Sequence, residues 1–130
     1  MKISPSTVLF LVVGVILAGL IGLAVMRDQA TAKYDSFAQC LTDKGAKMYG
    51  AWWCSHCEAQ KRLFGSSFDK IDYVECSPGG ARSFTAQVCK DAGIEGTPTW
   101  VFADGSRLGG EQTFQVLADK TECSDALPKE

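Results

Sequence analysis

A Cys-x-x-Cys pair, Cys54 and Cys57, directly follows two tryptophans, Trp52 and Trp53. If Cys54 opens a helix, Cys57 lies about one turn further along the same face, so the two sulfurs can form and break a disulfide with little backbone movement. The amino end of a helix stabilises negative charge, which favours the thiolate form of Cys54. The segment therefore predicts a turn and a helix built around two reactive thiols.

A permanent disulfide and half of a zinc site are the structural alternatives for this pair. A disulfide between residues i and i+3 closes a very small loop, so it contributes little to stability. We therefore expect a redox-active disulfide, in which Cys54 is the more exposed sulfur that attacks and is attacked. Cys57 is then the resolving thiol that closes the disulfide and releases the mixed intermediate.

His56 is the single histidine of the chain and lies between the two cysteines. An imidazole at this place can favour the Cys54 thiolate by charge or by a hydrogen bond. A stabilised thiolate stabilises the reduced pair, which makes the disulfide a stronger oxidant. The alternative is a solvent-exposed polar residue with no tuning role.

No charged residue occurs from Thr7 to Met26, and nearly all of these residues are apolar. A helix of this length spans roughly 30 Å, so we expect a transmembrane anchor over 7–26 behind a short segment, 1–6. A cleaved signal peptide is the alternative: its apolar region is usually shorter, about 7–15 residues, but Ala30-Thr31-Ala32 provides a small-x-small cleavage site. Both interpretations export everything after residue 27.

The rest of the chain has the composition of one small domain. With 130 residues there is room for one domain. The net charge of −2, with scattered Lys and Arg, gives no basic stripe for nucleic acid. Six cysteines fit an oxidising compartment better than a cytosol. We therefore expect a single-pass membrane protein whose domain lies in a periplasm, an extracellular space or a lumen.

Strand and helix patterns alternate after a polar tether over 27–34. We expect helices over 34–44, 54–64, 83–92 and 113–120, and strands over 46–51, 71–76, 99–102 and 106–108. Asp104-Gly105 marks a hairpin between the last two strands, and Thr113 is the expected N-cap of the last helix. This order predicts an α/β domain over 35–130 with a mixed sheet of about four strands flanked by helices.

The segment Trp53-Cys54-Ser55-His56-Cys57, the helix after it, and Gly96-Thr97-Pro98-Thr99 resemble the thioredoxin fold over about residues 35–122. More narrowly, three segments look like the thioredoxin-like domain fused to bacterial and plant homologues of vitamin K epoxide reductase. They are Met48 to Cys57, Tyr73 to Cys76, and Cys89 to Ile94 with Pro98-Thr99-Trp100. One membrane helix is expected here where those proteins have a multi-helix reductase domain.

The resemblance implies roles for further residues. Pro98 is expected to be the cis-proline that faces the cysteine pair, the alternative being an ordinary trans proline. Thr97 would offer backbone hydrogen bonds to an extended substrate chain, and Trp53 would lie at the edge of the site. Met48 stands where thioredoxins often have a buried carboxylate that helps to deprotonate the second cysteine. No other base is evident, so resolution by Cys57 would depend on water or on the partner.

Four more cysteines can pair in several ways: Cys40, Cys76, Cys89 and Cys123. Cys76 ends a strand and Cys89 lies on the next helix, which favours a local bridge worth about 3 kcal/mol. Cys40 and Cys123 would then join the first helix of the domain to the last. Structural disulfides are common in small exported domains. The alternative is that one pair relays electrons.

These observations lead to one main hypothesis and two alternatives. The main one is a membrane-anchored thiol–disulfide oxidoreductase that oxidises or isomerises exported proteins, with no bound cofactor or metal. From the resemblance, a quinone-linked reductase similar to vitamin K epoxide reductase would reoxidise it in trans. The first alternative is a tethered reductant, for example of haem-attachment cysteines. The second is a copper or zinc carrier using Cys54, Cys57 and His56, although copper carriers on this fold usually add a distant histidine.

Overall fold

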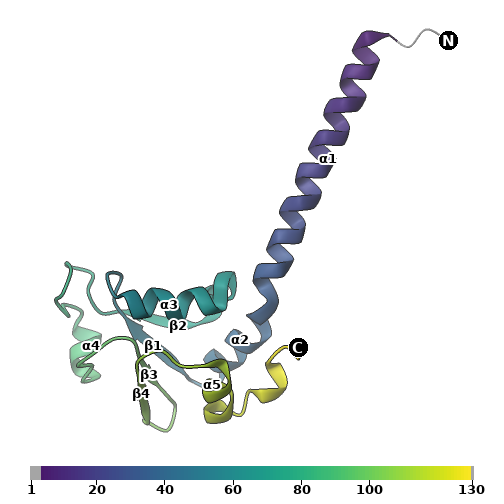
Figure 1. The fold of residues 1–130 in the computed structure, drawn as a ribbon. Coiled ribbons are helices and arrows are strands. Elements are labelled where there is room, and N and C mark those ends of the chain that lie inside the picture. Colours follow the sequence, from purple (N-terminus) through teal and green to yellow (C-terminus); the bar gives the residue numbers. More distant parts are fainter. Residues whose placement is uncertain (1–3, 130) are drawn as a thin grey trace. The chain divides into compact units, whose positions relative to one another are not determined.

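The computed structural model describes residues 4–129, with the backbone alone for residues 27–31. The chain forms two compact units, Met1–Thr31 and Ala32–Glu130, whose elements are labelled in Figure 1. Each unit is described by itself below.

The first unit is the helix α1 (Pro5–Thr31). Its stretch Pro5–Met26 is long and apolar enough to cross a membrane, and none of it is buried within the protein. A signal sequence meets the same criterion, so the helix fits both an anchor and a signal. The cleavage position expected after Ala32 involves side chains outside the described residues, as do residues 1–3 of the expected segment 1–6.

Helical backbone continues through the segment 27–34, where we expected a tether. The last turn of α1 and the 3-10 helix η1 (Ala32–Tyr34) occupy it. The sequence has no Gly or Pro at these positions to interrupt a helix.

The second unit is a four-stranded mixed sheet with helices around it. The strands are β1 (Lys47–Gly50), β2 (Asp72–Glu75), β3 (Thr99–Val101) and β4 (Arg107–Gly109), in the order β2-β1-β3-β4. β1 and β2 are parallel, whereas β3 is antiparallel to both β1 and β4. The helices are α2 (Asp35–Asp43), α3 (Ser55–Phe64), α4 (Gln87–Asp91) and α5 (Phe114–Thr121), with the 3-10 helices η2 (Gly65–Lys70) and η3 (Ser124–Ala126). The prediction of a thioredoxin-like α/β domain is confirmed.

Alternating side chains of β1 face two different cores, as expected for a strand covered on both sides. Met48 is fully buried in the larger core, which α2, α3 and α5 also line. Tyr49 faces a smaller core that contains Cys89 of α4 and Ile94. Met48 is also paired in register with Trp100 of β3, which is fully buried. Trp100 is therefore part of the core.

An aromatic cluster fixes the carboxyl end of α3. The ring of Phe64 lies 4.7 Å from that of Phe114 on α5 and 6.2 Å from that of Trp100, measured between centroids. Phe37 of α2 stacks on Phe64 at 6.1 Å. Such ring pairs add about 0.5–1.5 kcal/mol each beyond the burial of their area. They hold α3, and with it the two cysteines at its start, against the sheet.

The helix α4 is shorter than predicted, and the expected range 83–92 was wrong at its start. The backbone N–H of Ala86 bonds to the carbonyl of Cys76 at 3.2 Å, so residues 83–86 run as an irregular segment instead. The helix ends as expected, because Gly93 adopts a φ of +63° that other residues rarely take. Within this irregular segment, the ring of Phe84 stacks on that of Trp53.

Four cysteines form two disulfides in the structure, Cys40–Cys123 and Cys76–Cys89. These are the pairings favoured by the sequence. The first joins α2 to the segment after α5 across 83 positions, and the second joins the end of β2 to α4 across 13 positions. Both disulfides therefore link elements of the domain that pack around the sheet.

Removing the longer bridge should destabilise the oxidised chain more than removing the shorter one. By loop-closure entropy, Cys40→Ala with Cys123→Ala should lower the free energy of unfolding by about 4 kcal/mol, and Cys76→Ala with Cys89→Ala by about 3 kcal/mol. Urea unfolding followed by tryptophan fluorescence measures both. A larger loss for the shorter bridge would contradict the assignment of Cys40–Cys123 as the main covalent brace.

Candidate active site

The cysteine pair lies where β1 turns into α3. The turn is closed by a hydrogen bond from the Cys54 N–H to the carbonyl of Ala51 at 3.0 Å. Cys54 is the N-cap of α3, and its sulfur accepts the Cys57 N–H at 3.3 Å. Both cysteines are free thiols in this structure. Cys54 is 7% exposed and Cys57 is not exposed at all, so only the sulfur at the helix start can be approached from solvent.

The environment separates the acidities of the two thiols. Burial raises the pKa of Cys54, but the Cys57 thiol and N–H, the Thr97 side chain and the His56 N–H outweigh it through hydrogen bonds and hold that pKa below its ordinary value. For Cys57, burial and the hydrogen bond with Cys54 both act upward and raise the pKa to about 12. Cys54 is therefore the thiol of the pair that ionises more readily, whereas Cys57 keeps its proton at neutral pH.

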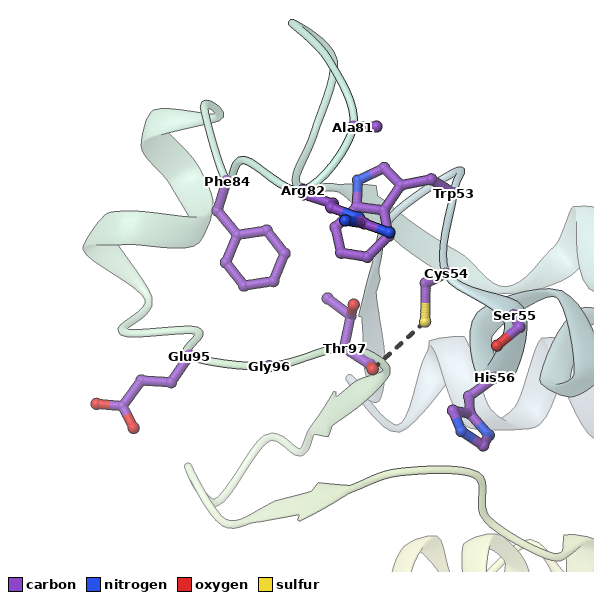
Figure 2. A pocket seen from close by; sticks show the side chains of 10 residues that line it. All are labelled: Trp53, Cys54, Ser55, His56, Ala81, Arg82, Phe84, Glu95, Gly96 and Thr97. Atoms are coloured by element: carbon purple, nitrogen blue, oxygen red, sulfur yellow. Dashed lines mark hydrogen bonds between the residues drawn. The ribbon is translucent and has the colours of Figure 1, made fainter.

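The Thr97–Pro98 peptide bond faces Cys54 and is cis, as the resemblance implies. The thiol of Cys54 donates to the Thr97 carbonyl at 3.4 Å, as the dashed line in Figure 2 shows. Pro98 is fully buried, and its own carbonyl accepts the Gly110 N–H at 2.8 Å. The fold thus places a main-chain segment directly across from the reacting sulfur.

A cavity of about 720 Å³ opens beside Cys54. Figure 2 shows its aromatic wall, where Trp53 and Phe84 stack with 6.5 Å between ring centroids. Arg82 and Glu95 also line it and bring charge of both signs. Trp53 is thus at the edge of the site, where we expected it. Sequence reasoning did not single out Phe84, Arg82 or Glu95.

Trp52, whose role the sequence left open, bonds to the chain segment that leads to the cavity wall. Its ring is 55% exposed, and its indole N–H donates to the carbonyl of Ser77 at 3.1 Å. Ser77 follows β2 and begins the segment that carries Phe84. Trp52 therefore ties the turn before Cys54 to the wall of the cavity.

The side chain of His56 does not bond to the Cys54 sulfur in this structure. The imidazole Nδ1 lies 2.5 Å from Glu111 Oε1, in the segment after β4. The His56 backbone N–H, rather than its ring, contributes to the lowered pKa of Cys54. We expected the imidazole to act on Cys54. In the structure it instead bonds to Glu111, a carboxylate partner that sequence reasoning missed.

The place of the family's buried carboxylate is filled by Met48, which is fully buried. Instead, β2 carries a polar pair: the Tyr73 hydroxyl donates to Glu75 at 2.8 Å, and Glu75 accepts the Ser77 N–H at 2.8 Å. Burial and the neighbouring Glu75 raise the pKa of Tyr73. A side chain on Gly50 would lie 2.6 Å from the Tyr73 ring, so glycine is needed there.

Within residues 4–129, no group of three or more His, Cys, Asp and Glu side chains is arranged to hold a metal ion. Cys54 and Cys57 hydrogen-bond through sulfur, while the His56 ring faces Glu111. The two cysteines thus lie together, while the imidazole named with them for a metal carrier bonds to Glu111.

Labelling of the reduced chain should distinguish the two thiols. Iodoacetamide should modify Cys54 with an apparent pKa below the ordinary 9.0, because hydrogen bonds stabilise its thiolate. Cys57 should stay unlabelled in the folded chain, because it is buried and protonated. Mass spectrometry of peptides labelled at a series of pH values measures both rates. Cys57→Ala is the control, and it should raise the Cys54 pKa by removing one hydrogen bond. Equal labelling of both cysteines in the folded chain would contradict the assignment.

No family model matches the chain. The chain is similar to the thiol-disulfide oxidoreductase LTO1 of Arabidopsis thaliana, with 47% identity over 89 residues. The match covers 66% of this chain and 23% of that protein. The chain therefore spans less than a quarter of that relative, and the matched part of the chain is homologous to a part of a thiol–disulfide oxidoreductase.

Proposed function

We propose that this chain is a thiol–disulfide oxidoreductase that oxidises or isomerises exported proteins through Cys54 and Cys57. The observation that carries the proposal is the asymmetry of the pair: an N-cap sulfur with a lowered pKa, next to a buried sulfur with a pKa of about 12. A structural disulfide needs no such asymmetry, whereas thiol–disulfide exchange depends on it. The similarity to part of a named thiol–disulfide oxidoreductase supports the same activity.

The reaction begins with the disulfide form of the pair. A substrate thiolate attacks the sulfur of Cys54, a new S–S bond joins the substrate to Cys54, and Cys57 leaves as a thiolate that takes up a proton. A second substrate thiolate then attacks the substrate sulfur of this mixed disulfide, and Cys54 leaves as a thiolate. The substrate has lost two electrons and forms a disulfide, while the two electrons reside on the reduced cysteine pair.

The acidity of the Cys54 thiol favours the second step of this reaction. A thiol with a low pKa leaves readily, so the second step is helped by the stabilised Cys54 thiolate. Burial of Cys57 raises its pKa and disfavours the thiolate that would attack the mixed disulfide, which leaves time for the substrate's second thiol. A reductant would instead need Cys57 to resolve that intermediate rapidly.

The chain needs an oxidant to act again. We propose a membrane-bound, quinone-linked reductase similar to vitamin K epoxide reductase, acting in trans. This partner is supported by the resemblance of the domain to those fused to such reductases. If α1 is retained as an anchor, it keeps the domain at the membrane where such a reductase would lie. The two further disulfides fit an oxidising compartment.

Substrate binding is proposed for Trp53, Thr97 and Pro98 together with the cavity beside them. An extended substrate chain can form main-chain hydrogen bonds with the segment before Pro98. Such bonds depend on the substrate's backbone rather than on its sequence. The side chain next to the substrate cysteine would then enter the cavity between Thr97 and the Trp53–Phe84 wall. The aromatic wall favours an apolar side chain there.

The reduction potential of the Cys54–Cys57 couple tests the proposed direction. Equilibration of the full chain in detergent with glutathione should give a value between about −120 and −200 mV, the range of known oxidants and isomerases. A value near about −270 mV or lower would instead identify the tethered reductant. The variant with Cys54→Ser is the control, since it cannot form the disulfide.

Removal of the aromatic wall should weaken substrate use without changing the couple. Phe84→Ala should lower kcat/KM roughly tenfold for a dithiol peptide with an apolar residue beside its cysteine, because about 1.4 kcal/mol of ring contact is lost. The reduction potential should be unchanged. Val88→Ala, an exposed position on α4 outside the cavity, is the matched control. Equal kcat/KM values for the two variants would rule out the cavity as a substrate subsite.

A further inference from the structure

The imidazole of His56 bonds to a carboxylate rather than to the reacting sulfur. His56 Nδ1 and Glu111 Oε1 are 2.5 Å apart, and the two side chains are 72% and 38% exposed. Figure 2 shows the ring directed away from the Cys54 sulfur. That sulfur hydrogen-bonds instead to the Cys57 N–H and to the Thr97 carbonyl.

The position of Glu111 is fixed by a buried clamp. Gln60 lies one turn after His56 on α3 and is fully buried. Its amide donates to the Gln112 carbonyl at 3.1 Å and accepts the Gln112 N–H at 2.6 Å. The Gln112 side chain in turn donates to the carbonyls of Gly109 and Gly110 at 3.0 and 3.3 Å. The residues next to Glu111 are thus bound to the helix that carries His56.

A clamp of this kind matters because exposed ion pairs are normally weak, since two long side chains must be ordered to form them. Here the backbone on one side is a helix and on the other is a segment fixed by Gln60, so less freedom is lost when the pair forms. The clamp therefore lowers the entropic cost of keeping the carboxylate beside the imidazole.

We propose that Glu111 is a positioning residue that holds His56 away from Cys54 and offsets its charge, and so limits the oxidising strength of the Cys54–Cys57 couple. The inference rests on the proposed function of that couple. An imidazolium near Cys54 would stabilise the thiolate and make the disulfide a stronger oxidant. Glu111 opposes this in two ways: its negative charge offsets the positive charge of the protonated ring, and its hydrogen bond directs the ring away.

Other charged groups around the site do not depend on this pair. Arg82 and Glu95 line the far side of the cavity, and Glu58 pairs with Lys61 at 3.1 Å along α3. Cys57 lies behind Cys54 and is uncharged at neutral pH. A double-mutant cycle separates the effect of the pair from the effects of these other groups.

The test compares Glu111→Gln, His56→Asn, the double variant and the unchanged full chain in detergent. Glu111→Gln should shift the equilibrium with glutathione toward the reduced protein by about twofold to fivefold, the effect of an exposed charge pair. This corresponds to a rise in potential of about 9–21 mV. The pKa of Cys54, followed by thiolate absorbance, should fall in parallel. The double variant should match His56→Asn, because the effect passes through the ring.

Two results would overturn the inference. One is an unchanged potential in Glu111→Gln; the other is an equal shift in the background of His56→Asn, which would mean that the carboxylate acts on the thiolate directly. Glu122→Gln removes the same charge from an exposed residue paired with Lys44, and it should leave the potential unchanged. If the Cys54–Cys57 couple of the unchanged chain does not exchange with glutathione, the proposed function itself fails. If the couple exchanges but its potential does not change in Glu111→Gln, only the inference about Glu111 fails.

Discussion

One sulfur both caps a helix and carries the proposed chemistry. The Cys54 sulfur accepts the N–H of Cys57 at the start of α3, which is the bond that an N-cap side chain normally provides. A thiolate is a better acceptor than a thiol, so the helix end stabilises the charged form of this sulfur. The capping requirement of α3 and the reactivity of Cys54 therefore have the same physical cause. Any residue that fixes the start of α3 also acts on the thiolate.

The rest of the domain keeps that helix end in place. Phe64 anchors the far end of α3 in the aromatic cluster, and Gln60 binds its middle to the segment after β4. Across from the start of α3, the buried Pro98 fixes the main chain that faces Cys54. With two anchors along α3 and one across from its start, the sulfur and the Thr97 carbonyl can keep their separation while the cavity beside them accepts different side chains. This division suits an enzyme that acts on many partners.

Much of this arrangement could be predicted from the sequence, because it depends on local patterns. The strands, the helix after the cysteines and the core position of Trp100 follow from periodicity and from turn residues. The start of α4 does not, because one hydrogen bond from Ala86 to Cys76 outweighs the helical preference of residues 83–86. Glu111 and Phe84 were missed for a related reason. Each reaches the site through a loop, and neither its residue type nor its spacing distinguishes it from an ordinary surface residue.

An apolar Met48 in place of a buried carboxylate also fits the proposed oxidising direction of the reaction. A base next to Cys57 would speed its attack on the mixed disulfide and so release the substrate unoxidised. An apolar Met48 and a fully buried Cys57 with a pKa of about 12 slow that step. Two carboxylates near the site have other partners: Glu75 binds the Tyr73 hydroxyl, and Glu111 binds His56. Neither of these two carboxylates is free to serve as a base for Cys57, which fits the proposed oxidising direction.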